Sequence, residues 1–221
     1  VRRPSQTHGA GTTDLSQAEA EVDVQVIITT WGHPSWAGRA SRVAIPSVAD
    51  QATAIYHHHE SNPDSAGGAR NRAVEIADPQ EWICFLDADD QLEPGYFNAM
   101  SRCLFEYGGD TTRLYTPALR LGTKPPEIYA DRDIVDGINP CPIGTLIHRS
   151  MFEEAGQFCG ERAWEDWSLF RRAVLVGATI EFVPDAIYSA HDNPKGRNST
   201  VPSPRQLRQQ ILRAHSAWLA Q

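Results

Sequence analysis

The sequence predicts one α/β domain, with a mainly parallel central sheet and helices on both of its faces. Two observations lead to this fold class. Between residues 24 and 90, segments with strand character alternate with segments with helix character, and such units form right-handed crossovers between parallel strands. The length of 221 residues and the 41% hydrophobic content suit a single large domain. We therefore expect 23–221 to form the domain and the polar, aperiodic residues 1–22 to form a flexible tail.

The first ninety residues contain three expected strands, at 24–31, 52–58 and 82–87. Helical segments are expected between them, at about 36–51 and at 66–78. Pro46 either breaks the first of these helices or begins a second one. The apolar face of the other is expected to consist of Ala73, Ile76 and Ala77. In a parallel sheet of this kind, ligands bind at the carboxyl ends of the strands.

The middle of the chain has a less regular pattern. A helix over 93–109 is expected to pack through Phe97, Met100 and Leu104 and to end at the Gly108-Gly109 pair. Residues 113–150 predict strands with long connections between them.

Two helices and a strand are expected in the last third of the chain. The first helix begins at Glu165 and packs through Trp167, Phe170 and Val174, and a strand follows at 179–184. The final helix covers 203–220, where Ser203 begins a capping box and Pro204 takes the first helical position. Its packing stripe is expected to be Leu207, Ile211, Ala214 and Trp218.

Charge and cysteine content exclude several classes of protein. The formal net charge of -8 argues against a nucleic-acid partner, because phosphate binding needs clustered Lys and Arg. The four cysteines lie far apart, which is not the pattern of a zinc knot or a disulfide framework. No apolar run reaches the length of a membrane span, and no signal-peptide pattern opens the chain. We therefore expect a reduced, cytoplasmic protein without a membrane anchor.

Three carboxylates follow the third strand within four positions, in the run LDADD. Asp87 and Asp89 alternate with Ala88, so their side chains can point the same way. Two carboxylates on one side form a partial shell for Mg²⁺ or Mn²⁺, which substrate phosphates can complete. The alternative is a solvated turn in which an Asp caps the next helix.

Two further clusters flank this acidic run along the chain. Arg70, on the helix before the third strand, could contact a phosphate or hold one of the acids. Glu165 and Asp166 lie between two tryptophans, and an aromatic face beside a carboxylate is a common way to hold a sugar ring. Since Trp167 fits the packing stripe of its helix, Trp164 is the candidate for stacking on a sugar.

The run RN…EWICFLDADD, followed by IGTLIHRSMFEEAGQF…WEDWSLFRRA, resembles the family 2 inverting glycosyltransferases with the GT-A fold. The resemblance extends over roughly residues 24–192 and rests on two motifs in the right order, the D-x-D and the Glu-Asp pair. It implies a single GT-A (Rossmann-like) domain that moves a sugar from a nucleoside diphosphate donor to an acceptor hydroxyl with inversion. A UDP-sugar is the favoured donor, Mn²⁺ or Mg²⁺ is the implied cofactor, and the acceptor is unknown.

The resemblance also implies roles for single residues on the donor side. Thr29, Thr30 and Trp31 would border the nucleotide base, although Trp31 could equally pack in the core. Arg70 would approach the nucleotide or its phosphates. Asp87 would contact the ribose region and Asp89 the metal that bridges the diphosphate.

On the acceptor side, Asp166 would be the general base, with Glu165 beside it, and Trp164 would contact the acceptor. His191 matches a position at which related enzymes often have a metal-ligating His, but it could also be an ordinary polar residue. Arg197 would close a loop over the diphosphate unless it is merely solvated.

The sequence departs from the family after the second strand, where an Asp that reads the base is usual. The stretch here is YHHHESNPDS, so the base is left open. His57 and His59 fall on one face of a strand and His58 on the other, so at most two of them could share a ligand. A nucleotidyltransferase of similar fold and a catalytically silent sugar-nucleotide or glycan-binding module remain the alternative functions.

Overall fold

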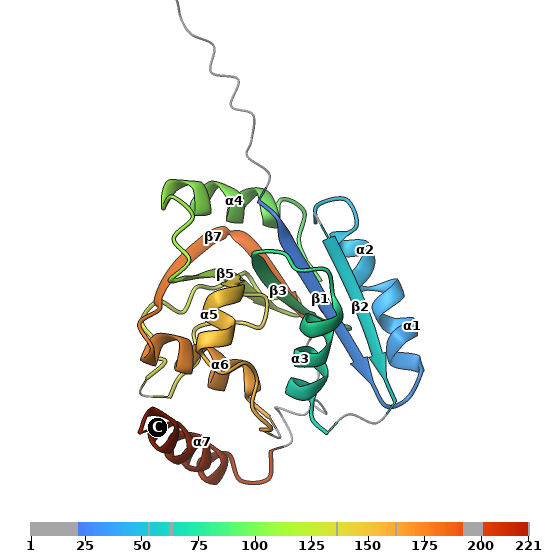
Figure 1. The fold of residues 1–221 in the computed structure, drawn as a ribbon. Coiled ribbons are helices and arrows are strands. Elements are labelled where there is room, and N and C mark those ends of the chain that lie inside the picture. Colours follow the sequence, from blue (N-terminus) through green and yellow to red (C-terminus); the bar gives the residue numbers. More distant parts are fainter. Residues whose placement is uncertain are drawn as a thin grey trace, which may run out of the picture.

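A computed structural model of the chain describes residues 22–52, 54–61, 64–135, 137–161, 163–191 and 201–220. It confirms the predicted α/β class, with helices packed around a largely parallel sheet (Figure 1). The expected tail falls, except for Val22, outside the described residues.

The strands form two sheets rather than one. The first sheet has the order β2-β1-β3-β6, with strands Ala54–Glu60, Val24–Trp31, Trp82–Asp87 and Ile147–His148. The second has the order β4-β7-β5, with strands Gln91–Leu92, Thr179–Ala190 and Arg113–Leu121. In each sheet the long strands are parallel and one short strand, β6 or β4, is antiparallel. A bridge between Tyr115 and Leu146 links the two sheets.

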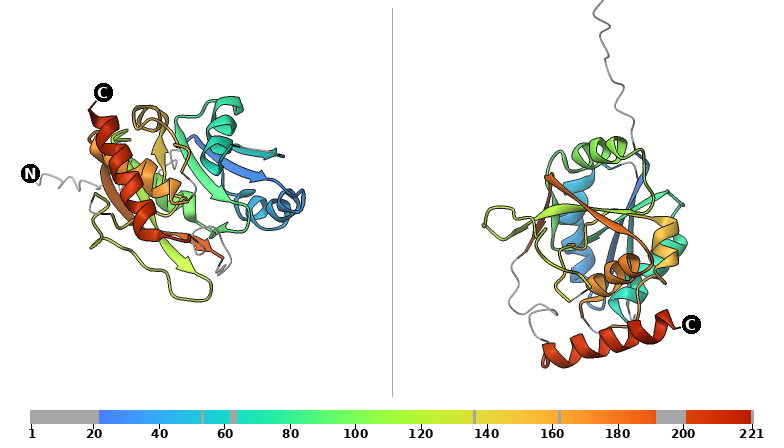
Figure 2. Two further views of the ribbon diagram at one scale, coloured as in Figure 1. Left: turned by 90° about the horizontal axis from the view of Figure 1, so that it is seen from below. Right: turned by 90° about the vertical axis from the view of Figure 1, so that its left-hand side faces the viewer.

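Helices cover both faces of the first sheet, as the sequence predicts. Helices α1 (Ser35–Arg42) and α2 (Ala44–Val48) lie on one side of the strands, and α3 (Ala66–Ile76) lies on the other (Figure 2). The break between α1 and α2 falls at Val43, three residues before Pro46. A second helix does follow, but it begins at Ala44, so Pro46 is its third residue and not its first. Pro46 lies in the first turn of α2, where its missing N–H has no helical partner to lose.

Helix α3 packs through a face of small residues. Its buried members are Ala66, Gly67, Ala69, Arg70, Ala73 and Val74. The prediction that Ile76 belongs to this face was wrong, because Ile76 is 58% exposed. A Cβ on Gly67 would lie 2.7 Å from Phe158, so the absence of a side chain lets α3 approach the segment before α6 (Glu165–Leu175).

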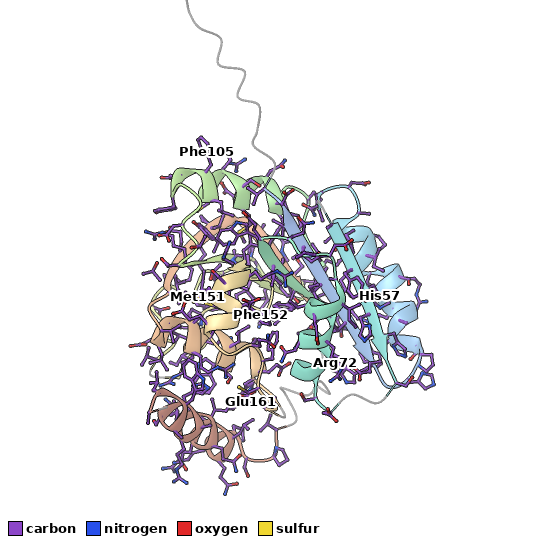
Figure 3. All side chains as sticks on the ribbon, viewed as in Figure 1. His57, Arg72, Phe105, Met151, Phe152 and Glu161 are labelled. Atoms are coloured by element: carbon purple, nitrogen blue, oxygen red, sulfur yellow. The ribbon has the colours of Figure 1, made fainter. Side chains whose placement is uncertain are left out.

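The helix α4 (Tyr96–Glu106) packs against β7 and β5 of the second sheet, and the short helix α5 (Arg149–Glu154) packs beside β6 and α6. Phe97, Met100 and Leu104 are buried as predicted, and α4 ends before two glycines with positive φ. Phe105 points away from the core, in agreement with its 75% exposure (Figure 3).

The C-terminal helix α7 (Pro204–Leu219) begins where it was predicted but packs differently. Ser203 makes no side-chain cap hydrogen bond, so the predicted capping box was wrong. Ala214 is exposed, and the buried position next to it is taken by His215. Ile211 is buried as predicted. The buried stripe of α7 therefore includes a polar residue, and its partners are the residues of α6.

A polar network joins α7 to α6. His215 Nδ1 accepts from Arg171 Nη1 at 2.8 Å, and His215 Nε2 lies 2.9 Å from Ser168 Oγ. Ser168 Oγ in turn accepts from Arg172 Nη1 and donates to Glu161, which Figure 3 labels near α7. These directions are consistent if His215 is neutral and carries its proton on Nε2. In agreement, burial and then the two arginines lower the pKa of His215 to about 4.

Candidate active site

The carboxyl ends of β1 and β3 lie side by side and form the edge at which the site is built. The parallel register pairs Thr29 with Asp87, so the residues expected on the donor side come from adjacent strands. Gly32 then turns the chain away from β1 with a φ of 71°, a conformation that favours glycine.

Arg70 connects this edge to the start of α6. Its Nη2 donates to Asp87 Oδ1 at 2.6 Å, and its Nη1 donates to Glu165 Oε1 at 2.6 Å. The guanidinium is buried, and it also lies 5.3 Å above the ring of Phe158. Of the two roles that the sequence allowed, Arg70 therefore holds acids. Its predicted approach to the nucleotide phosphates stays a prediction.

Asn71 makes a second connection between α3 and the segment that leads into α6. Its side chain donates to the carbonyl oxygen of Phe158 at 2.9 Å and accepts from the Phe158 N–H at 3.0 Å. The amide thus pairs with a backbone unit on both of its ends. Together, Arg70 and Asn71 set the position of α6 relative to the strand edge.

The three acids of LDADD have three different environments. Asp87 is partly exposed and is paired with Arg70. Asp90, which the sequence did not single out, is buried and accepts from the Tyr188 hydroxyl at 2.6 Å and from the His191 N–H at 2.7 Å. Burial and the charge of Asp87 raise the pKa of Asp90 to about 7. Asp90 therefore ties the end of β7 to the acidic run and carries His191 to the same edge.

Among the three acids of this run, Asp89 is the candidate ligand for a cation. Burial, and then the charge of Asp87, raise its pKa, while Arg39 and His191 act in the opposite direction. No set of three His, Cys, Asp or Glu side chains that could hold a metal is found among the residues the structure describes. Carboxylates such as Asp87 and Asp89 are ligands of the kind that Mg²⁺ takes, one or two at a time, together with phosphate oxygens.

Arg39 is a residue of this edge that the sequence did not indicate. It lies on α1, the helix that follows β1, and its charge acts on Asp89. Its Nε atom is buried and has no hydrogen-bond partner within the described part of the chain. A motif search could not have found it, because an isolated Arg in an amphipathic helix has no signature.

The start of α6 carries the acid proposed as the base. Asp166 is half-buried, and Asn139 Nδ2 donates to its Oδ2 at 3.1 Å. Burial, followed by the charge of Glu165, raises the pKa of Asp166 to about 6. Glu165 itself is buried against Arg70, so the two neighbours differ in exposure. The catalytic role predicted for Glu165 is untested, and its contacts are those of a residue that holds the helix.

Trp164 and Trp167 differ in burial, as the sequence suggested. Trp167 is buried and donates from its indole to the Ile134 carbonyl oxygen at 3.1 Å. Trp164 is half-buried and has a φ of 62°, a region that non-glycine residues seldom occupy. Such strain is found more often at functional sites than elsewhere. The acceptor role of Trp164 stays a prediction.

On the β2 side of the strand edge, the Thr30 side chain forms hydrogen bonds with residues of β2. Its Oγ1 lies 3.1 Å from His57 Nε2 and 2.9 Å from His59 Nδ1. The sequence placed these two histidines on one face, and their shared partner agrees with that face. Beyond them, Glu60 accepts two hydrogen bonds from Arg72, which Figure 3 labels on α3. Trp31 is half-buried and pairs with Glu60 in register, so it is not a core residue.

The structure thus brings most of the predicted site residues to one edge of the molecule. Thr29, Asp87, Asp89 and His191 meet at the strand ends, and Asp166 is connected to them through Arg70 and Glu165. Arg197 lies outside the described residues. In the described part of the chain, no helix is long and apolar enough to cross a membrane.

Comparison with known proteins agrees with this fold. Residues 41–110 match the family model for glycosyl transferase family 2, a segment that includes Arg70 and the acidic run. S. aureus TarS 1-349 in complex with UDP-GlcNAc is similar at 15% identity and a TM-score of 0.65, over 89% of this chain and 66% of that one. GalNAc-T7 with UDP, GalNAc and Mn²⁺ is similar at 12% identity and a TM-score of 0.61, over 88% of this chain and 48% of that one. No curated protein matches the sequence.

The chain has the GT-A fold, and the predicted resemblance to family 2 glycosyltransferases is confirmed. It spans about two thirds of the TarS 1-349 chain and about half of the GalNAc-T7 chain. At these identities the structural likeness establishes the fold alone.

Proposed function

We propose that the protein transfers a sugar from a nucleoside diphosphate donor to an acceptor hydroxyl, with inversion at the anomeric carbon. The observation that carries this proposal is the connection of two carboxylate groups through one arginine. Asp87 belongs to the strand edge at which a nucleotide would bind, and Glu165 precedes the candidate base Asp166. The family match and the UDP-bound structural neighbours support a sugar nucleotide, and a UDP-sugar in particular.

The donor is expected to lie across the ends of β1 and β3. Thr29, Thr30 and Trp31 would border the base, and Asp87 would meet the ribose. Asp89 and His191 would hold Mn²⁺ or Mg²⁺, with the donor diphosphate supplying the remaining ligands. When bound, such a cation offsets the charge of the departing diphosphate.

The acceptor is expected on the α6 side. Its hydroxyl oxygen attacks the anomeric carbon from the face opposite the diphosphate and forms the new glycosidic bond. The carbon–oxygen bond to the diphosphate breaks, and its electron pair leaves with the nucleoside diphosphate. Asp166 takes the proton of the hydroxyl. A pKa of about 6 suits this task, because the carboxylate is largely charged at neutral pH yet more basic than an ordinary Asp.

The experiment that tests the proposal is Asp166→Asn. The variant should bind donor and fold normally, while turnover falls by roughly 10²- to 10⁴-fold, because Asn cannot accept the proton. If Asp166 merely favours the N-terminus of α6, Asn should serve nearly as well and the change should be silent. Initial rates with a panel of nucleotide sugars and thermal unfolding give the two readouts.

The product separates the proposal from its alternatives. Release of nucleoside diphosphate supports glycosyl transfer, whereas pyrophosphate chemistry points to a nucleotidyltransferase. Normal turnover by a well-folded Asp166→Asn protein would remove the base from the mechanism. No turnover by the unsubstituted protein across the panel would favour a binding module.

A further inference from the structure

Asn139, in the segment between β5 and β6, makes a side-chain contact with the proposed base, Asp166. Asn139 Nδ2 donates to Asp166 Oδ2 at 3.1 Å, and Asn139 Oδ1 accepts from the Cys141 N–H at 3.0 Å. The backbone N–H can only donate, so the end of the amide that faces Cys141 must be the oxygen. The end that faces Asp166 is therefore the NH₂ group. The local hydrogen bonds thus determine the orientation of the amide.

Several groups act on the charge of the Asp166 carboxylate, and Asn139 acts on it in a different way from the others. The charged and titratable groups that act on it are Glu165 on its own helix, Arg70 on α3 and Asp87 on β3. The thiol of Cys141, on the same segment as Asn139, also lies close enough to be affected by Asp166. Two carboxylates oppose the charge on Asp166 and one arginine favours it. The backbone N–H of Trp167 also donates to Asp166, and Asn139 adds a side-chain donor that acts at a single, known oxygen, Oδ2.

We propose that Asn139 is a positioning residue for the general base, and that it holds Asp166 Oδ2 so that Oδ1 receives the proton of the acceptor hydroxyl. This inference rests on the proposed function, since it assigns a partner to the base of that reaction. A donor to one oxygen limits the rotation of the carboxylate and leaves the other oxygen in one place. The result is a base aimed at the α6 side of the site before the acceptor arrives.

The same contact affects the strength of the base. A hydrogen bond to a carboxylate favours its charged form, so it lowers the pKa that burial and Glu165 raise. Without Asn139, Asp166 would be protonated over a wider range below neutral pH and would act as a base in a smaller fraction of the molecules. A merely structural residue in this segment has no such effect.

Two substitutions of Asn139 test the inference. Asn139→Asp keeps the oxygen that Cys141 needs but replaces the donor with a negative charge. Asn139→Leu has a similar size, lacks the donor, and provides a second test if the Asp variant does not fold. The matched control is Arg132→Gln, because Arg132 Nη1 donates to the backbone oxygen of Asn139 at 3.3 Å and not to its amide. The control loosens the same segment without touching the contact to Asp166.

The readout is the pKa of Asp166, followed by carboxyl ¹³C NMR, with the resonance assigned by its loss in Asp166→Asn. We expect an upward shift of about one pH unit or more in Asn139→Asp, a smaller upward shift in Asn139→Leu, and none in Arg132→Gln. The acidic limb of the kcat/KM profile should move by the same amount. The KM for the donor should be unchanged.

An unchanged Asp166 pKa in both folded Asn139 variants overturns the inference, as does an equal shift in Arg132→Gln. The pKa of Asp166 is measured without turnover, so this test can fail or succeed independently of the proposed function. If Asp166→Asn abolishes turnover while the Asn139 variants leave the acidic limb in place, the base stands and its partner is wrong. If Asp166→Asn turns over normally, the proposed function itself has failed.

Discussion

The guanidinium of Arg70 lies 2.6 Å from Asp87 and 2.6 Å from Glu165, so one buried cation joins the end of β3 to the first turn of α6. The chain separation between Arg70 and Glu165 is 95 residues. On the proposed function, this contact sets the spacing between the donor edge and the base.

We expect Arg70→Met to destabilise the fold by about 3–5 kcal/mol, because it leaves Glu165 charged and buried without its cation. Urea unfolding measures the free energy. The control is Arg72→Met on the same helix, whose partly exposed pair with Glu60 should be worth about 1 kcal/mol or less. Equal small losses in both variants would contradict the structural role of Arg70. Adding Glu165→Gln to Arg70→Met should recover part of the loss.

Binding of a nucleoside diphosphate should depend on Mn²⁺ or Mg²⁺, and Asp89→Ala should remove that dependence. The reason is that Asp89 is held close to another carboxylate at the strand edge, a cost that a cation would offset. Titration calorimetry with and without a chelator measures it, and Asp185→Ala, at an exposed acid, is the control. Equal affinity of the unsubstituted protein under both conditions would exclude the metal role.

Arg39→Gln should weaken nucleoside diphosphate binding by roughly tenfold, since a cation beside the proposed diphosphate site would be lost. Binding of the nucleoside without phosphates should be unchanged. Arg42→Gln is the matched control, because Arg42 is exposed on the same helix. A parallel loss of nucleoside affinity in Arg39→Gln would indicate a general disturbance of the edge instead of a phosphate contact.

His215 should make the protein less stable in acid. Its pKa falls from 6.5 to about 4 on folding, because burial and the neighbouring Arg171 and Arg172 oppose a third positive charge. Between these two pH values the unfolded chain binds a proton that the folded protein does not, so stability falls as the pH falls. The full effect, reached below pH 4, is about 3 kcal/mol.

The raised pKa values of Asp90 and Asp166 act in the opposite direction over part of the same range, because the folded state then binds the extra proton. The measurement is therefore the difference in unfolding free energy between the unsubstituted protein and His215→Gln, from pH 7 to pH 4. The stability advantage of the unsubstituted protein should shrink as the pH falls. A difference that is independent of pH would mean that His215 does not titrate as described.

Local sequence patterns were sufficient for the elements nearest the site. Strands β1 and β3 have the bounds that were predicted, because continuous apolar runs admit few other structures. The parallel order of β1, β2 and β3 followed from the alternation of strands and helices. The position of the acidic run at the carboxyl edge followed from that order, since the direction of a strand determines which end its last residues occupy.

Packing was harder to predict, because it depends on partners far away in the chain. Ile76 was assigned to the buried face of α3, but small residues on the neighbouring positions let α3 approach the sheet and leave Ile76 outside. His215 was not expected in the core, because a polar residue can be buried only when others complete its hydrogen bonds. Those others, Ser168 and Arg171, lie more than 40 residues earlier.

The sequence by itself determined the α/β class, the strand edge and the identity of the acids on it, all of which follow from local pattern and chain direction. Only the tertiary structure decided what each acid does there. Asp87 pairs with Arg70, Asp90 binds the end of β7, and Asp166 is held by Asn139. The physical reason is that the state of a carboxylate depends on the charges and donors within a few ångströms, and folding brings these from distant parts of the chain.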